Sequence, residues 1–198
     1  MSPPKLTKFN VMTLADKAAG GIAPKPVYIL AIRGYRRDTM GVPGRNDVGI
    51  YDDAMFLVSP TEFKAVNANT DPSRLGWNPG VGKPYAMLDT GIWYFIKGPH
   101  KGRSPALRQA TLEEAKKFGV PDFGYFKVTR SAVGNKPAYK EVGYFAINIH
   151  SGGDSTTSSW GCQTIPPNDF LSFMDLVWKQ MTKYNQQTIP YILINGPV

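Results

Sequence analysis

Closely spaced turn-forming residues divide this chain into short segments, and they limit the folds that are open to it. The 198 residues include 20 glycines and 17 prolines, a high content for a helical protein that fits a chain with many turns. Between the turns lie short runs rich in β-branched and aromatic residues, which are typical of strands. The sequence therefore predicts an α+β fold that is rich in strands.

The expected strands are separated by connections of different length. A long irregular loop is expected over 67–82, where Asn, Asp, Pro and Gly are frequent. The run over 85–96 is either a pair of strands or one strand that bends at Gly91, and a short turn is expected over 97–102. The strands are predicted over 27–33, 50–58, 62–68, 85–96, 125–130, 139–149 and 190–194.

Three segments carry helix signals. A capping box that begins at Thr111 predicts a helix over 112–118, and a short helix is expected over 13–19. A third, longer helix is expected after the prolines of 166–168. Its apolar residues recur at helical spacing and should face the core: Phe170, Phe173, Met174, Val177, Met181 and Tyr184.

The layout predicts an N-terminal arm over 1–25 and a single domain over 26–198. Apolar residues make up 42% of the chain, which is enough for a sizeable core. No run approaches the length of an apolar membrane span, so stable membrane insertion is not expected. The N-terminus lacks the apolar segment of a signal peptide. We therefore expect a protein that is made in the cytoplasm and stays there until something releases it.

The net charge of +8 should attract the protein to a polyanion such as nucleic acid, anionic lipid or cell wall. The basic residues are scattered, and the chain has neither a helix-turn-helix pattern nor an aromatic RNA-binding motif. Nucleic acid is therefore not an expected partner. The charge fits long-range attraction to an acidic surface, and it equally fits a generically basic soluble protein.

The only cysteine of the chain, Cys162, follows one of its two histidines, His150, within one short stretch. A thiol needs a base to become a thiolate near neutral pH, and histidine is the usual base. The residues between the two are small and polar, which suits a loop that bends back on itself. The stretch thus holds the minimum parts of a Cys/His nucleophilic site, with a thiol pKa below that of free cysteine. The alternative is a buried, unreactive Cys162 and a packing role for His150.

This stretch resembles the catalytic signature of the YkuD-type L,D-transpeptidase family. His150-Ser-Gly resembles the histidine side of the signature, and Ser159-Trp-Gly-Cys162 resembles its Ser-x-Gly-Cys element. The clear resemblance covers about residues 140–166. It is also similar to small phage-encoded proteins that carry a Gly-Cys-Gln-Thr variant of the motif. The resemblance implies a β-rich sandwich or barrel-like body with one long helix after the nucleophile.

The resemblance also implies catalytic roles. Cys162 would attack the carbonyl of the diamino acid in a peptidoglycan stem peptide, and His150 would act as the base. The carbonyl of Ser151 would hold the imidazole, and the amides of Gly161 and Cys162 would face the oxyanion. The acyl-enzyme would be a thioester, which water hydrolyses and which an amine converts into a new crosslink.

The stretch departs from the family pattern in its substrate contacts. Trp160 stands where the family often has His, Thr164 stands where it often has Arg or Asn, and the spacing from His150 to Cys162 is shorter than usual. Nearby residues are candidates to replace the missing contacts, the two arginines by binding substrate carboxylates. Solvent-exposed charge and an exposed turn histidine are the alternatives. The candidate substrate-binding residues are Ser159, Trp160, His100, Arg103 and Arg108.

Other acidic and metal-binding patterns carry less information. Asp52 and Asp53 are adjacent, as paired carboxylates can be in glycosidases, but neighbours on a strand point to opposite faces. Asp71, in an Asn-Thr-Asp-Pro run, is expected to form a turn. Two distant histidines and one cysteine match no standard metal-ligand spacing, so neither a metal nor a cofactor is expected.

These features lead us to expect a bacteriolytic, phage endolysin-like cysteine peptidase that cleaves the L,D bond in stem peptides of bacterial peptidoglycan. It would be a monomer that stays in the host cytoplasm until release to the periplasm and cell wall. One alternative is a biosynthetic L,D-transpeptidase, against which the lack of an export signal argues. The other is a non-catalytic virion or wall-binding protein, which the missing Arg after Cys162 favours slightly.

Overall fold

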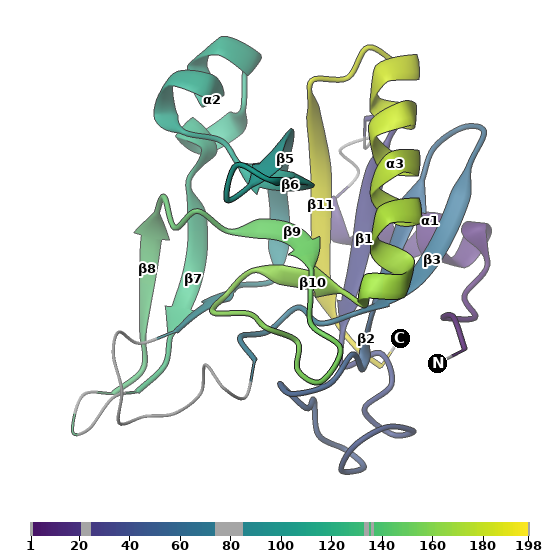
Figure 1. The fold of residues 1–198 in the computed structure, drawn as a ribbon, viewed down its shortest axis with the longest axis vertical. Coiled ribbons are helices and arrows are strands. Elements are labelled where there is room, and N and C mark those ends of the chain that lie inside the picture. The colour runs from purple at the N-terminus through teal and green to yellow at the C-terminus, as the bar shows by residue number, and fades with distance from the viewer. Residues whose placement is uncertain (1, 21–24, 74–84, 133–134, 136, 198) are drawn as a thin grey trace.

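The computed structural model describes residues 2–20, 25–73, 85–132, 135 and 137–197 (Figure 1). These residues form a strand-rich α+β structure with three α-helices, one eight-stranded sheet and one three-stranded sheet. The expectation of a β-rich α+β fold is confirmed. Among the helices of these residues, none is long and apolar enough to cross a bilayer.

The larger sheet nearly closes into a barrel. Its strand order is β10-β9-β6-β5-β11-β1-β2-β3, and the pairs β1–β11 and β9–β10 are parallel. The two edge strands meet where the backbones of Asn69 and Thr164 exchange two hydrogen bonds of 2.8 Å. This contact satisfies backbone groups that an open edge would leave exposed. The strands are β1 (Tyr28–Arg33), β2 (Asp53–Val58), β3 (Phe63–Ala68), β5 (Gly91–His100), β6 (Ser104–Gln109), β9 (Asn148–Ser151), β10 (Gln163–Ile165) and β11 (Thr188–Asn195).

The smaller sheet has the order β4-β7-β8 and stands beside β5, β6 and β9 in Figure 1. Two of the expected strands turn out to be shared between the sheets. The run over 85–96 breaks before Gly91 into β4 and β5, and the run over 139–149 breaks at 144–147, where Ala146 has a φ of 56°. The strands of the smaller sheet are β4 (Ala86–Leu88), β7 (Phe126–Arg130) and β8 (Tyr139–Gly143).

Helices α1 and α2 both begin with a capping box. In α1 (Lys8–Ala18) the Thr7 side chain accepts from the amide of Asn10, so the helix starts earlier than the expected 13–19. The sequence signal was weak there because Asn, rather than Glu or Gln, completes the box. In α2 (Leu112–Phe118) the expected box and bounds are confirmed.

Helix α3 (Pro167–Lys183) packs on the sheet through the expected apolar stripe. Phe173, Met174 and Val177 are fully buried in one cluster with side chains of β1, β2, β5 and β11. Figure 1 shows the helix alongside β11 and β1. Burying each such side chain contributes roughly 1.5–3 kcal/mol, so this contact fixes the helix that follows Cys162.

A second apolar cluster covers the other face of β1, β2 and β11. Val11 and Ala15 of α1 are fully buried there against Leu30, Ile32 and Phe56. The N-terminal segment over 8–18 therefore contributes to a packed core.

Several connections differ from the expected ones. The turn expected over 97–102 lies at 101–103, because β5 continues to His100, which pairs with Ser104 of β6. Strands β6 and β10 had no sequence signal, since they are short or rich in polar residues. The loop expected over 67–82 begins after β3, and residues 74–82 lie outside the described residues.

Candidate active site

Strands β9 and β10 bring His150 and Cys162 to one region. The two strands are parallel, with Thr164 opposite His150. Cys162 lies just before β10, and its Sγ accepts a hydrogen bond of 3.4 Å from the backbone N–H of Asn148. Asn148 and His150 are two residues apart on β9, so their side chains share one face of the sheet. The fold therefore gathers the thiol and the imidazole although a loop separates them in sequence.

The tautomer of His150 follows from its backbone contact. Its Nδ1 lies 2.6 Å from the carbonyl oxygen of Ser151. A carbonyl can only accept, so Nδ1 carries the proton and Nε2 keeps a lone pair that can take a proton. This is the orienting contact expected of Ser151. His150 is 8% exposed, so solvent competes little for this hydrogen bond.

His100 lies against His150. The two imidazole rings are nearly parallel, with centroids 4.0 Å apart and an interplanar angle of 13°. The side-chain amide nitrogen of Asn148 lies 3.1 Å from Nδ1 of His100. Since that amide nitrogen can only donate, Nδ1 of His100 is the acceptor and the proton of the neutral ring is on Nε2. His100 was named from the sequence as a substrate-binding candidate; the structure shows it in contact with the candidate base.

Burial keeps the three groups of the site neutral at rest. Burial, the nearby charge of a protonated His100 and Lys101 lower the pKa of His150 to about 4, although the Ser151 carbonyl acts in the other direction. Burial and Lys101 also lower the pKa of His100. Burial raises the pKa of the Cys162 thiol, opposed by the Asn148 amide and by Lys101. The structure thus differs from the expected lowered thiol pKa, because the thiol lies in a largely desolvated place.

The turn before Cys162 requires a glycine at Gly161, and hydrogen bonds of the Ser159 side chain hold it in place. Gly161 has a φ of 145°, and a Cβ there would lie 2.4 Å from the carbonyl oxygen of Ala86. Ser159 is buried; its Oγ accepts from the Gly161 amide at 3.0 Å and donates to the Cys162 carbonyl at 2.5 Å. The Gly161 amide is therefore already bonded, and the Cys162 amide is left as the candidate donor to an oxyanion.

Gln163 supports the same turn from inside the barrel. Its Nε2 donates to the Gly161 carbonyl at 3.2 Å, and its Oε1 accepts from the hydroxyl of Tyr191 at 2.8 Å. Both side chains are fully buried. Sequence reasoning missed these residues, because Tyr191 is on β11 and no local pattern links it to the Cys162 turn.

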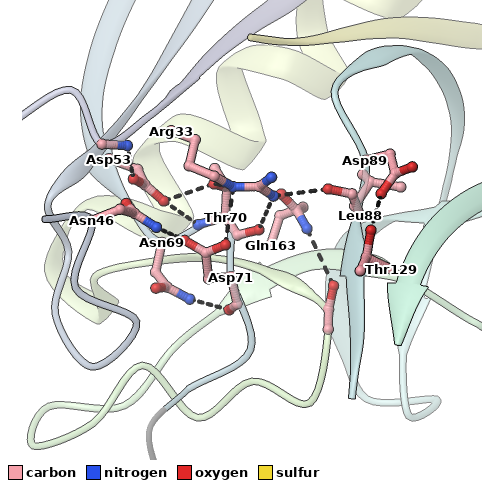
Figure 2. A network of polar contacts seen from close by, with 12 residues as sticks. Arg33, Asn46, Asp53, Asn69, Thr70, Asp71, Leu88, Asp89, Thr129 and Gln163 are labelled. Atoms are coloured by element: carbon pink, nitrogen blue, oxygen red, sulfur yellow. Dashed lines mark hydrogen bonds and ion pairs between the residues drawn. The ribbon is translucent and has the colours of Figure 1, made fainter. Parts of the chain in front are cut away.

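Next to Gln163 lies a buried network of charged and polar groups around Arg33 (Figure 2). Nε of Arg33 is 2.9 Å from Oδ1 of Asp71, and its Nη2 donates to the carbonyls of Thr70 and Leu88 at 2.9 Å. The hydrogen bond to Leu88 reaches the end of β4, so the network joins the larger sheet to the smaller one. Asp71 lies at a bend, as expected, and it is also fully buried in this ion pair.

Asp52 and Asp53 are both fully buried, which the alternation of strand faces did not predict. Asp52 lies before β2, so the alternation of side chains between the two faces of a strand does not apply to it. Asp53 accepts hydrogen bonds from the amide of Gly34 and from the amide and hydroxyl of Thr70. Burial and the neighbouring Asp71 and Asp52 raise the pKa of Asp53 to about 8, and burial raises that of Asp52 to about 6.

The loop after His150 packs against the side chain of Tyr51. The Tyr51 hydroxyl donates to the Gly153 carbonyl at 2.8 Å, and a Cβ at Gly152 would lie 2.0 Å from that hydroxyl oxygen. The glycines after His150 therefore allow close packing of the two loops. This gives the His-Ser-Gly-Gly run a structural reason that is independent of catalysis.

A pocket of about 420 Å³ borders the Cys162 turn. It includes Ala86, whose carbonyl faces Gly161, and Trp160, which is 65% exposed and packs edge-on against Tyr85 at 5.6 Å. The Arg130 guanidinium lies 5.0 Å from the Phe145 ring. The pocket is thus aromatic with one cation. Its lining residues are Tyr85, Ala86, Arg130, Tyr144, Phe145, Ala146 and Trp160.

The two arginine candidates are placed differently. Arg108 forms a two-point ion pair with Glu114, with Nη1 2.7 Å from Oε2 and Nη2 against Oε1. This pairing lowers the pKa of Glu114 to about 2. Arg103 is exposed in the turn after β5, and its amide donates to the His100 carbonyl. The charge of Arg108 is therefore already matched, and substrate binding by either arginine stays a prediction.

Within the described part of the chain, no group of three or more His, Cys, Asp or Glu side chains is placed to hold a metal ion. Comparison of the chain with protein-family models, with curated proteins and with solved structures finds no match.

Proposed function

We propose that this protein is a cysteine-dependent acyl transferase with Cys162 as nucleophile and His150 as base. The observation that carries the proposal is the hydrogen bond from Nδ1 of His150 to the Ser151 carbonyl. It leaves Nε2 as the basic atom of a buried imidazole, on the strand whose Asn148 backbone N–H donates to the thiol two residues earlier.

The reaction begins from the neutral pair. As Sγ of Cys162 attacks the substrate carbonyl, its proton passes to Nε2 of His150 and negative charge develops on the carbonyl oxygen. The Cys162 amide donates to that oxygen. When the C–N bond breaks, the leaving amine takes the proton from His150 and a thioester remains. Water, which loses a proton to His150, then attacks the thioester; the C–S bond breaks, the acid is released and the Cys162 sulfur takes the proton back from His150. An amine that attacks in place of water would form a crosslink.

The substrate we propose is the stem peptide of bacterial peptidoglycan, cut at the L,D bond between the diamino acid and D-alanine. The support is the resemblance of 140–166 to the L,D-transpeptidase signature, together with the net charge of +8. The fold we propose is accordingly that of the L,D-transpeptidases. An endolysin-like protein of this kind would act as a monomer, after release from the host cytoplasm to the cell wall.

A non-catalytic wall-binding protein is the second candidate. The raised thiol pKa of Cys162 and the exposed Trp160 beside an aromatic pocket favour it. Aromatic side chains that remain exposed around a pocket are typical of binding surfaces. The two candidates differ in turnover, so one experiment separates them.

That experiment is digestion of purified murein, with the soluble products identified by mass spectrometry. We expect muropeptides with shortened stems and intact glycan from the wild type, and none from Cys162→Ala. His150→Ala should lose roughly 10²–10⁴-fold in rate while remaining folded. Intact murein with tight, salt-sensitive binding would contradict the enzyme and support the wall-binding protein. Cut glycosidic bonds would show that the bond is wrongly assigned.

A further inference from the structure

A reaction through one thiol and one imidazole does not by itself require a second histidine. Nevertheless His100, from the end of β5, lies face to face with His150 of β9 at 4.0 Å between ring centroids. Strand β6 pairs with both β5 and β9, so the two rings meet across three neighbouring strands. The arrangement depends on the sheet order and not on local sequence.

We propose that His100 is a positioning residue for His150. Held by the side-chain amide of Asn148, its neutral ring stacks on the imidazole of His150 and fixes the plane in which His150 receives the Cys162 proton. This inference rests on the proposed function of Cys162 and His150. His100 itself neither gives nor takes the proton, which passes from Sγ to Nε2 of His150 and on to the leaving amine.

Asn148 links all three groups. Its backbone N–H donates to Sγ of Cys162 at 3.4 Å, and its side-chain amide lies 3.1 Å from Nδ1 of His100. It also precedes His150 by two residues on the same strand, so the side chains of the two share one face. A shift of Asn148 would therefore move the thiol and both rings together.

The contacts also explain why His100 should stay neutral. Protonation of Nδ1 would break the hydrogen bond from Asn148, and a second imidazolium would then face the one that forms on His150. Among the described residues, Lys101 in the β5–β6 turn adds to burial in lowering the pKa of both rings. Asn148 brings two further groups near: the Cys162 thiol on its backbone N–H, and Arg108, its partner on β6, whose charge is matched by Glu114. A proton on His100 would lower the pKa of His150 further, so His100 must stay neutral for His150 to take the Cys162 proton.

The test uses the fact that the full chain has two histidines. In protein labelled with ¹⁵N-histidine, we expect one imidazole protonated at Nδ1, assigned to His150, and one protonated at Nε2, assigned to His100. His100→Phe keeps an aromatic ring but removes Nδ1, which accepts the hydrogen bond from the Asn148 side-chain amide. In that variant we expect a higher His150 pKa and a kcat on murein lower by roughly 10- to 100-fold, with KM little changed.

Asn148→Ala is the second variant, because it keeps the backbone N–H to Cys162 and removes the side-chain amide. It should bring the pKa of His100 closer to its ordinary value and lower kcat in the same way. Both histidines protonated at Nε2 would overturn the proposal, and so would an unchanged His150 pKa in His100→Phe together with an unchanged kcat in both variants. The NMR readout does not need turnover. A Cys162→Ala protein that still digests murein would therefore refute the proposed function, and the tautomers would be judged separately.

Discussion

At the scale of single residues, Gly161 is the position where the turn before Cys162 tolerates least change. Gly161→Ala would add a Cβ 2.4 Å from the Ala86 carbonyl at a φ of 145°. Gly102→Ala is the matched control, since Gly102 also has positive φ, 70°, but no atom of the described residues lies within 4 Å of its Cβ position. We expect the control to lose about 1–2 kcal/mol of unfolding free energy from its dihedral alone.

Gly161→Ala should lose more unfolding free energy than this control and should also lose murein digestion, because the turn must move away from β4. Urea unfolding of both variants, with activity measured on the same samples, makes the comparison. Equal losses in the two proteins would show that the contact with Ala86 does not shape the site.

The residues of the site differ in how far the sequence predicts their roles. His150, Ser151 and Cys162 stand in a recognisable motif, so their proximity could be predicted. Asn148 and Gln163 carry no sequence signal, because their roles depend on His100 and Tyr191, which other strands bring near. The thiol pKa was also unpredictable, since it follows from burial and burial is a property of the finished fold.

At the scale of elements, β10 is anchored to β11 by the hydroxyl of Tyr191. Tyr191→Phe would leave Oε1 of the fully buried Gln163 without its donor. We expect a loss of about 1–3 kcal/mol of unfolding free energy, because a buried acceptor without a partner keeps its full desolvation cost. In Tyr184→Phe, where the hydroxyl lies 3.5 Å from Thr61 at an exposed site, the change should stay within about 0.5 kcal/mol.

Thermal or urea unfolding measures the unfolding free energy of both tyrosine variants. If Cys162 is the nucleophile, murein digestion by Tyr191→Phe should also slow, since Gln163 holds the Gly161 carbonyl beside Cys162. Wild-type stability and activity in Tyr191→Phe would mean that β10 needs no support from β11.

Elements that carry a local sequence signal could be predicted, and elements set by packing could not. Helix α2 was predicted from its capping box and α3 from its apolar stripe. Both are local features of the sequence, and both are present in the structure. The sequence left the run over 85–96 open between a strand pair and one bent strand, and it predicted a single strand over 139–149, because the β-prone residues of 139–149 continue across the break. Each run changes from one sheet to the other, and that change is determined by packing, which periodicity does not report.

At the scale of the whole molecule, the buried acidic network should make stability depend on pH. The folded pKa of Asp53, about 8, is above the ordinary aspartate value. The folded protein therefore holds this proton more tightly than the unfolded chain does. Its contribution to stability is complete below the ordinary pKa of about 3.9 and is lost as the pH rises toward the folded value.

We therefore expect the unfolding free energy to fall between about pH 4 and pH 8, measured by urea unfolding at several pH values. Asp53→Asn should be less stable at pH 5 and should show a flatter profile, because it cannot lose a proton. Asp38→Asn is the control, since the side chain of Asp38 is 60% exposed, and it should keep the wild-type profile. An unchanged slope in Asp53→Asn would contradict a proton on Asp53.

The nearly closed sheet brings together segments from most of the chain, and its closure at Asn69 and Thr164 lies two residues from Cys162. The central claim is that this assembly makes Cys162 a covalent nucleophile. The most direct measurement is the intact mass of the protein, quenched in acid within the first turnover on a soluble stem-peptide substrate. We predict a mass increase equal to the acyl fragment, located on Cys162, removed by hydroxylamine and absent from Cys162→Ala. Cleavage of the substrate without such an adduct, or equal cleavage by Cys162→Ala, would contradict the claim.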